Sequence, residues 1–182
     1  MSLLDDVSIV VTPNGYKAGT LYGVLPTATE GSELVVNGDF ATDSDWTKGS
    51  SWSISGGKAN YDAVTTASEL KQLMSSIAAG KIIKIQFDIL DVQAGKDAFF
   101  KLEIDGSPEA VFGYTKFSEG TYTYYHTIAN AFDRLAFFPL NTSTGGAFSI
   151  DNVSVKEWTA SDMDVTRATA ATRVDENGLV NY

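Results

Sequence analysis

The run Lys81-Ile82-Ile83-Lys84-Ile85-Gln86-Phe87-Asp88-Ile89-Leu90-Asp91-Val92 alternates apolar and polar side chains along most of its length. Alternation with a period of two places the Ile and Phe side chains on one face of a strand and the Lys, Gln and Asp side chains on the other. A strand of this kind keeps one face in a core and one in water, as in an antiparallel sandwich. The run therefore predicts a half-buried β-strand.

Other runs of the same kind extend over residues 33–158, separated by Gly, Asp and Asn. Short strands with turn signals at intervals predict an all-β fold, an antiparallel β-sandwich. The turn signals are Asn37-Gly38-Asp39, Gly56-Gly57 and Asp105-Gly106, whose residues tolerate the backbone of a tight turn. We expect strands at residues 34–36, 52–54, 58–61, 81–92, 99–104, 111–117, 121–128, 134–138 and 147–157.

Residues 68–79 allow two interpretations. Leu70, Leu73, Met74 and Ile77 recur at helical spacing, which indicates a short helix. A strand that carries Leu70 and Gln72 is the alternative. We favour the strand, leading into an irregular turn, because sandwiches of this kind place a strand here.

The chain divides into three parts. Residues 1–30 are an N-terminal arm with a short β-hairpin, residues 31–158 form the sandwich, and residues 159–182 are an extended C-terminal segment. Residues 27–32 read as a polar linker between the first two parts.

The two arms are poorly equipped to fold alone. Residues 7–12 and 17–25 read as the hairpin strands, and two strands alone are marginal in water. Residues 162–174 are rich in Thr and Ala and offer few large apolar side chains, and a turn signal follows at residues 175–178. We therefore expect the arms to pack on the sandwich or on another chain.

Composition and charge narrow the range of partners. The chain has 182 residues, of which 43% are hydrophobic and 12% aromatic, enough for one strand-rich core. Its formal net charge of -10 disfavours nucleic acid and anionic membranes, because both require clustered Lys and Arg, and we attribute the acidity to solubility. There is no cysteine, no run long enough to span a bilayer and no signal-peptide pattern at the start, so we expect synthesis in the cytosol.

The middle of the chain resembles the galactose-binding-like jelly rolls, which include many carbohydrate-binding modules of plant-cell-wall hydrolases. The resemblance is carried by Asn37-Gly38-Asp39-Phe40, by Trp46, and by Ile150-Asp151-Asn152-Val153-Ser154-Val155. It implies a jelly-roll sandwich with Phe40 and Trp46 in the core. These marks are core and turn residues, so they point to the fold more than to an activity.

The flanks resemble a different class, the structural proteins of tailed-bacteriophage virions. The matching segments are residues 10–22, from Val10-Val11-Thr12-Pro13 to Leu21-Tyr22, and residues 164–174. In that class the second segment follows soon after the first, whereas here the sandwich separates them. The resemblance implies a jelly roll inserted into a short virion motif, which is physically reasonable because the ends of a sandwich can lie close together.

The sequence offers no catalytic apparatus. His126 is the single histidine and cysteine is absent, so neither a zinc site nor His-based catalysis is expected. Asp88, Asp91, Glu103 and Asp105 lie in expected strands or turns, and nothing in their spacing places two across a cleft as a glycosidase requires. We therefore expect a protein that is not an enzyme.

The jelly-roll resemblance also implies a structural calcium ion between the first and the last strand. Asp39 and Asp151 fall in those two places, and Ca²⁺ takes carboxylate and carbonyl oxygens as ligands. In the alternative, which we favour, Asp39 caps its turn and Asp151 faces water.

Tyrosines are the candidate ligand contacts, because an aromatic ring stacks on the apolar face of a pyranose. Alternation places Tyr125 on the opposite face of its strand from the two tyrosines that precede it, so at most one set is exposed on a given face. Core packing or a chain–chain interface explains these rings as well as a glycan does. The candidates are Tyr114, Tyr122, Tyr124 and Tyr125, with Trp46 and Trp52 behind them.

Two functions follow as hypotheses. The first is a virion structural protein, a decoration or fibre module located in the phage particle, with arms that dock to other virion proteins and a homotrimeric assembly. The second is a carbohydrate-binding module, free-standing or appended to an enzyme, that holds a polysaccharide or a cell-surface glycan. The two are compatible, because a virion decoration can bind host sugars.

Overall fold

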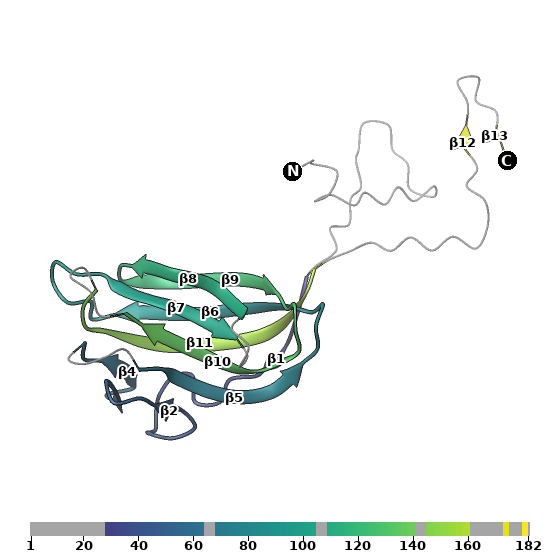
Figure 1. Ribbon diagram of the computed structural model, residues 1–182. Coiled ribbons are helices and arrows are strands. Elements are labelled where there is room, and N and C mark those ends of the chain that lie inside the picture. Colours follow the sequence, from purple (N-terminus) through teal and green to yellow (C-terminus); the bar gives the residue numbers. More distant parts are fainter. Residues whose placement is uncertain are drawn as a thin grey trace. The chain divides into compact units, whose positions relative to one another are not determined.

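The computed structural model describes residues 28–63, 68–104, 109–140, 145–160, 173–174 and 180–181. Thr29–Thr159 form one compact unit of two antiparallel sheets stacked face to face (Figure 1). Every regular element among the described residues is a strand, so the predicted all-β sandwich is confirmed. The helical interpretation of residues 68–79 is wrong, because Leu70–Ile77 is a strand. Among the described residues, no helix has the length and apolar character needed to cross a membrane.

The strand order is that of a jelly roll. Strands β4 to β11 are divided between the sheets in the orders β4-β11-β6-β9 and β5-β10-β7-β8, which is the arrangement of two interlocked Greek keys. The six-stranded sheet consists of β3 (Trp52–Ser55), β4 (Lys58–Tyr61), β11 (Phe148–Thr159), β6 (Ile82–Leu90) and β9 (Gly120–Thr127), with β1 (Thr29–Glu33) paired to β11. The five-stranded sheet consists of β2 (Thr47–Lys48), β5 (Leu70–Ile77), β10 (Phe132–Pro139), β7 (Ala98–Ile104) and β8 (Glu109–Phe117).

The core lies between the two sheets and is rich in aromatic rings. β6 supplies its predicted inward face, with Phe87 fully buried. The Phe87 ring lies 5.8 Å from Phe100 and 5.7 Å from Phe137, both of the opposite sheet. Such offset or edge-on ring contacts stabilise a core beyond the area that they bury.

The turn after β1 anchors the start of the sandwich as predicted. Asn37 adopts a positive φ of 52°, and its carbonyl accepts a hydrogen bond from the indole of the buried Trp46. Gly38 packs directly on the last strand, where an added Cβ would lie 2.0 Å from the carbonyl oxygen of Val153. Phe40 is buried, as expected from the sequence.

The predicted first strand is wrong by a few residues. The strand is β1, Thr29–Glu33, in the region predicted as a polar linker, and Leu34–Val36 follow it. β1 is exposed throughout and is specified by pairing with β11 instead of by apolar alternation. The Glu33 carboxylate accepts hydrogen bonds from the amides of Leu34, Val35 and Val155, and so adds to the contact between this segment and β11.

The entry and exit of the sandwich are neighbours. Thr29 pairs with Thr159 across β1 and β11, which lie side by side at one end of the unit (Figure 1). In the C-terminal segment β12 (Arg173–Val174) pairs antiparallel with β13 (Val180–Asn181), on either side of the predicted turn. The predicted N-terminal hairpin, the Asp105-Gly106 turn and residues 162–172 lie outside the described residues.

Candidate functional site

Two of the four candidate tyrosines point into the sandwich. Tyr122 and Tyr124 stack on Phe87 with ring centroids 5.9 Å and 6.1 Å away. Burial, followed by the neighbouring Tyr122, raises the pKa of the Tyr124 hydroxyl. These partly buried rings pack against the core and are not part of an exposed ring surface.

The other two tyrosines are exposed but lie on opposite sheets. Tyr114 is 45% exposed on β8 of the five-stranded sheet, and Tyr125 is 54% exposed on β9 of the six-stranded sheet. The predicted set of four is therefore split into a buried pair and two separate surface positions.

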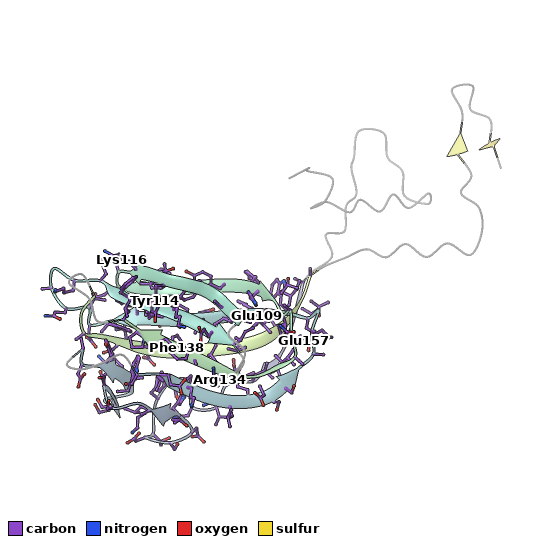
Figure 2. All side chains as sticks on the ribbon, in the orientation of Figure 1. Glu109, Tyr114, Lys116, Arg134, Phe138 and Glu157 are labelled. Carbon is purple, nitrogen blue, oxygen red and sulfur yellow. The ribbon has the colours of Figure 1, made fainter. Side chains whose placement is uncertain are left out.

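Tyr114 belongs to a row of rings on the outer face of the five-stranded sheet. Its ring lies 5.7 Å from that of Phe99 on β7, and the Lys101 ammonium lies 5.6 Å from the Tyr114 centroid and 4.7 Å from that of Phe138. Phe138 pairs with Lys101 across β10 and β7. We call Phe99, Tyr114 and Phe138 the aromatic row. Figure 2 labels Tyr114 on β8 and Phe138 and Arg134 on β10 of this sheet.

Charged side chains lie within and beside the aromatic row. Lys101 forms an ion pair with Glu103, which is only 5% exposed, and the hydrogen bond to Glu103 raises the pKa of Lys101. Farther across the sheet, Glu69 pairs with Lys71 and lies 3.8 Å from Arg134. The surface thus combines ring faces with donors and acceptors that are held in place by one another.

The candidate metal ligands lie near the turn at residue 39 and on β11. Asp39 is exposed and its Oδ1 accepts a 3.4 Å hydrogen bond from the Ala41 amide, which is the capping role of the alternative interpretation. Asp151 is partly buried, and burial, followed by Asp88 and Asp39, raises its pKa. Asp88 and Asp39 are therefore each close enough to repel the Asp151 carboxylate, while the Asn152 amide and Lys58 act in the opposite direction.

Two carboxylates alone do not complete a calcium site. Within the part of the chain that the structure describes, no group of three or more His, Cys, Asp or Glu side chains is arranged to hold a metal ion. Ca²⁺ at Asp39 and Asp151 would take its remaining ligands from backbone carbonyls and water, which the ion accepts. The net upward shift in the pKa of Asp151 fits a nearby cation, and calcium stays a prediction.

His126 has a structural partner. Its Nε2 lies 2.7 Å from Oε1 of Glu109, whose carboxylate also accepts hydrogen bonds from the amides of Ala129 and Asn130. Burial raises the pKa of Glu109, but these three hydrogen bonds outweigh it and the net shift is downward. The contact ties β8 of one sheet to β9 of the other.

The sequence interpretation missed Phe99 and Phe138. Both occupy outward-facing positions of their strands, next to inward-facing residues, Phe100 and Phe137, that are buried. The sequence did hold a signal for them, because each is a large aromatic residue at a position where the alternating pattern predicts a solvent-facing side chain.

Comparisons with known proteins give fold likenesses only. No protein-family model matches the chain, and no curated protein matches its sequence. Among solved structures, the chain is similar to the enzymatically active domain of tailspike protein 4 of bacteriophage CBA120, with 15% identity and a TM-score of 0.49. That match covers 69% of this chain and 21% of the tailspike chain.

Two xylan-binding modules are similar as well. The low-affinity module CBM86 from Roseburia intestinalis has 12% identity and a TM-score of 0.47, over 75% of this chain and 98% of that one. The CBM22-1 domain of Paenibacillus barcinonensis Xyn10C has 14% identity and a TM-score of 0.46, over 70% and 95%. With TM-scores under 0.5, these likenesses carry no argument, and the jelly-roll assignment rests on the strand order itself.

Proposed function

We propose that the sandwich binds a glycan through the aromatic row and does not transform it. The observation that supports this proposal is the line of three rings across β8, β7 and β10, with Tyr114 45% exposed. The flat, apolar face of a pyranose ring stacks on such rings, while its hydroxyls accept hydrogen bonds from the Lys101 ammonium, which the buried Glu103 holds in place. The jelly-roll resemblance in the sequence points to the same class of ligand.

A protein partner fits the aromatic row less well. The cores of protein interfaces are depleted of Lys and Glu, because burying them in a dry contact costs free energy. Here Lys101 lies between two rings of the row and is paired with Glu103. A sugar, in contrast, offers hydroxyl groups that form hydrogen bonds with these charged side chains in place of the water that it displaces.

The proposal gives a magnitude for Tyr114→Ala. A tyrosine side chain has roughly 200 Å² of surface, so its 45% exposure leaves about 90 Å² for a ligand. At about 25 cal/mol per Å², a sugar that covers one ring face, roughly half of this area, gains about 1 kcal/mol of binding free energy. A sugar that covers all of it gains about 2 kcal/mol. We expect Tyr114→Ala to weaken binding by about fivefold to thirtyfold.

Affinity electrophoresis of the intact chain tests the proposal. Gels that contain xylan, hydroxyethylcellulose or galactomannan should retard the wild type in at least one case. Tyr114→Ala should be retarded measurably less than the wild type, and Tyr114→Phe as much as the wild type, because the Phe variant retains the ring. Equal mobility in all three polysaccharides and in plain gels would refute the proposal, as would a Tyr114→Ala variant that binds like wild type.

The absence of chemistry is tested on the same polysaccharides. We expect no reducing ends to be released during prolonged incubation with the intact chain. Release that disappears on replacing one carboxylate would show an enzyme instead.

A virion structural role is the second candidate. It is supported by the pairing of Thr29 with Thr159, which places the start and the end of the sandwich side by side, as expected of a domain inserted into another segment. We propose on this basis that the chain is a homotrimeric decoration or fibre component of a phage particle. Light scattering of the intact chain should give the mass of a trimer, and a strict monomer at all concentrations would count against this role.

A further inference from the structure

A second pair of rings lies on the outer face of the six-stranded sheet. Tyr125 of β9 is 54% exposed, and its ring meets that of Trp158 of β11 edge-on at 4.9 Å. β6 lies between these strands and places Ile82 opposite Trp158 and Lys84 opposite Tyr125. We call Tyr125 and Trp158 the Tyr125–Trp158 pair.

Charged groups surround this pair and are held together. The Lys84 ammonium lies 5.8 Å from the Trp158 ring centroid and 2.6 Å from a carboxylate oxygen of Glu30. The other oxygen of Glu30 accepts a 3.0 Å hydrogen bond from Lys156. One carboxylate thus bridges two ammonium groups beside the rings, while Thr123 and Thr127 lie exposed on the same face of β9 as Tyr125.

The chemistry of this face suits a neutral glycan better than a protein. A dry protein contact over the rings would desolvate Lys84, Lys156 and Glu30 together, and interface cores avoid these residue types. A pyranose stacks its own apolar face on an aromatic ring, and its hydroxyls both donate and accept hydrogen bonds. Each charged side chain therefore keeps a hydrogen-bond partner when the sugar binds. A strongly anionic glycan would compete with Glu30 for the two lysines.

We propose that the Tyr125–Trp158 pair is a second glycan-binding site, for neutral pyranose chains, on the face opposite the aromatic row. The outer faces of the two sheets of a sandwich point in opposite directions, so one copy of the protein holds two polysaccharide chains at once. The inference rests on the proposed function for the class of ligand, but on different residues.

Isothermal titration of the intact chain with xylohexaose, cellohexaose and mannohexaose tests this proposal. For a hexasaccharide that binds, the wild type should take up two molecules per chain, Tyr125→Ala and Tyr114→Ala one each, and the double variant none. Ser53→Ala, an exposed change on β3 at the other edge of the same sheet, should behave as wild type. Light scattering of soluble xylan, hydroxyethylcellulose and galactomannan should show cross-linking by the wild type and less cross-linking by either single variant.

The outcomes separate the two sites. If Tyr114→Ala removes all binding and Tyr125→Ala leaves the stoichiometry unchanged, the second site is refuted and the proposed function stands. If Tyr125→Ala removes all binding and Tyr114→Ala none, the proposed site is refuted and the second site stands. If Tyr125→Ala instead lowers the oligomeric mass and leaves sugar uptake unchanged, the pair is a contact between copies and the inference fails.

Discussion

Replacing Glu109 by alanine should weaken the connection between the two sheets. The carboxylate accepts three hydrogen bonds, at 2.7 Å from His126, 2.8 Å from the Ala129 amide and 3.1 Å from the Asn130 amide, and its side chain is only 12% exposed. Each such bond contributes about 0.5–1.5 kcal/mol net to the free energy of unfolding. When the carboxylate is removed, the two exposed amides form hydrogen bonds to water instead, which reduces the loss. We therefore expect Glu109→Ala to lower the free energy of unfolding by about 2–3 kcal/mol.

Urea denaturation of the intact chain, followed by tryptophan fluorescence, measures this loss. Glu119→Ala is the matched control, because its carboxylate accepts one hydrogen bond, from the Val92 amide at 3.0 Å, and should cost about 1 kcal/mol or less. Glu109→Gln keeps an acceptor oxygen and should fall between the two. A change below about 0.5 kcal/mol for Glu109→Ala would refute the reasoning.

The same contact predicts a pH dependence. The folded pKa of Glu109 lies below its ordinary value of 4.5, so its stabilising contribution is present above that value and is lost as the pH falls through the folded pKa. Between pH 7 and pH 3 the wild type should lose more stability than Glu109→Gln, and equal losses would contradict this account.

Three further variants probe the core, the first turn and the acidic cluster. Phe87→Ala should cost about 3–5 kcal/mol in urea denaturation, because it removes a fully buried ring that meets rings from both sheets; a loss below about 1 kcal/mol would contradict that packing. Gly38→Ala should destabilise by about 1–3 kcal/mol, because its Cβ would meet the Val153 carbonyl at 2.0 Å; unchanged stability would show that the turn shifts freely. Asp151→Asn should raise the melting temperature in EGTA near neutral pH, since a carboxyl whose pKa is raised destabilises the folded state above that pKa. Added Ca²⁺ should raise the melting temperature of the wild type and not of this variant, and no calcium response would remove the predicted metal site.

The strands could be predicted because their pattern is local. Alternation in β6 and the glycines between β3 and β4 each specify a strand or a turn from a few adjacent residues. β1 could not be found in this way, because its sequence Thr-Glu-Gly-Ser-Glu is exposed throughout and becomes a strand only by pairing with β11.

The surface sites depend on register, which a single sequence does not reveal. Alternation correctly separated Tyr125 from Tyr122 and Tyr124. That Trp158 meets Tyr125 follows from the order β11-β6-β9, and that Tyr114 meets Phe99 follows from the bulged pairing of β8 with β7. Residues distant in the sequence form each site, so only the arrangement of the strands brings them together.

The central claim is that the outer face of the five-stranded sheet holds a glycan. The most direct measurement is a ¹H–¹⁵N NMR titration of the intact chain with the hexasaccharide that binds most tightly. The account predicts that amides around Tyr114 on β8, Phe99 on β7 and Phe138 on β10 shift with a common dissociation constant. Saturable binding that leaves the amides of β7, β8 and β10 unshifted would contradict it.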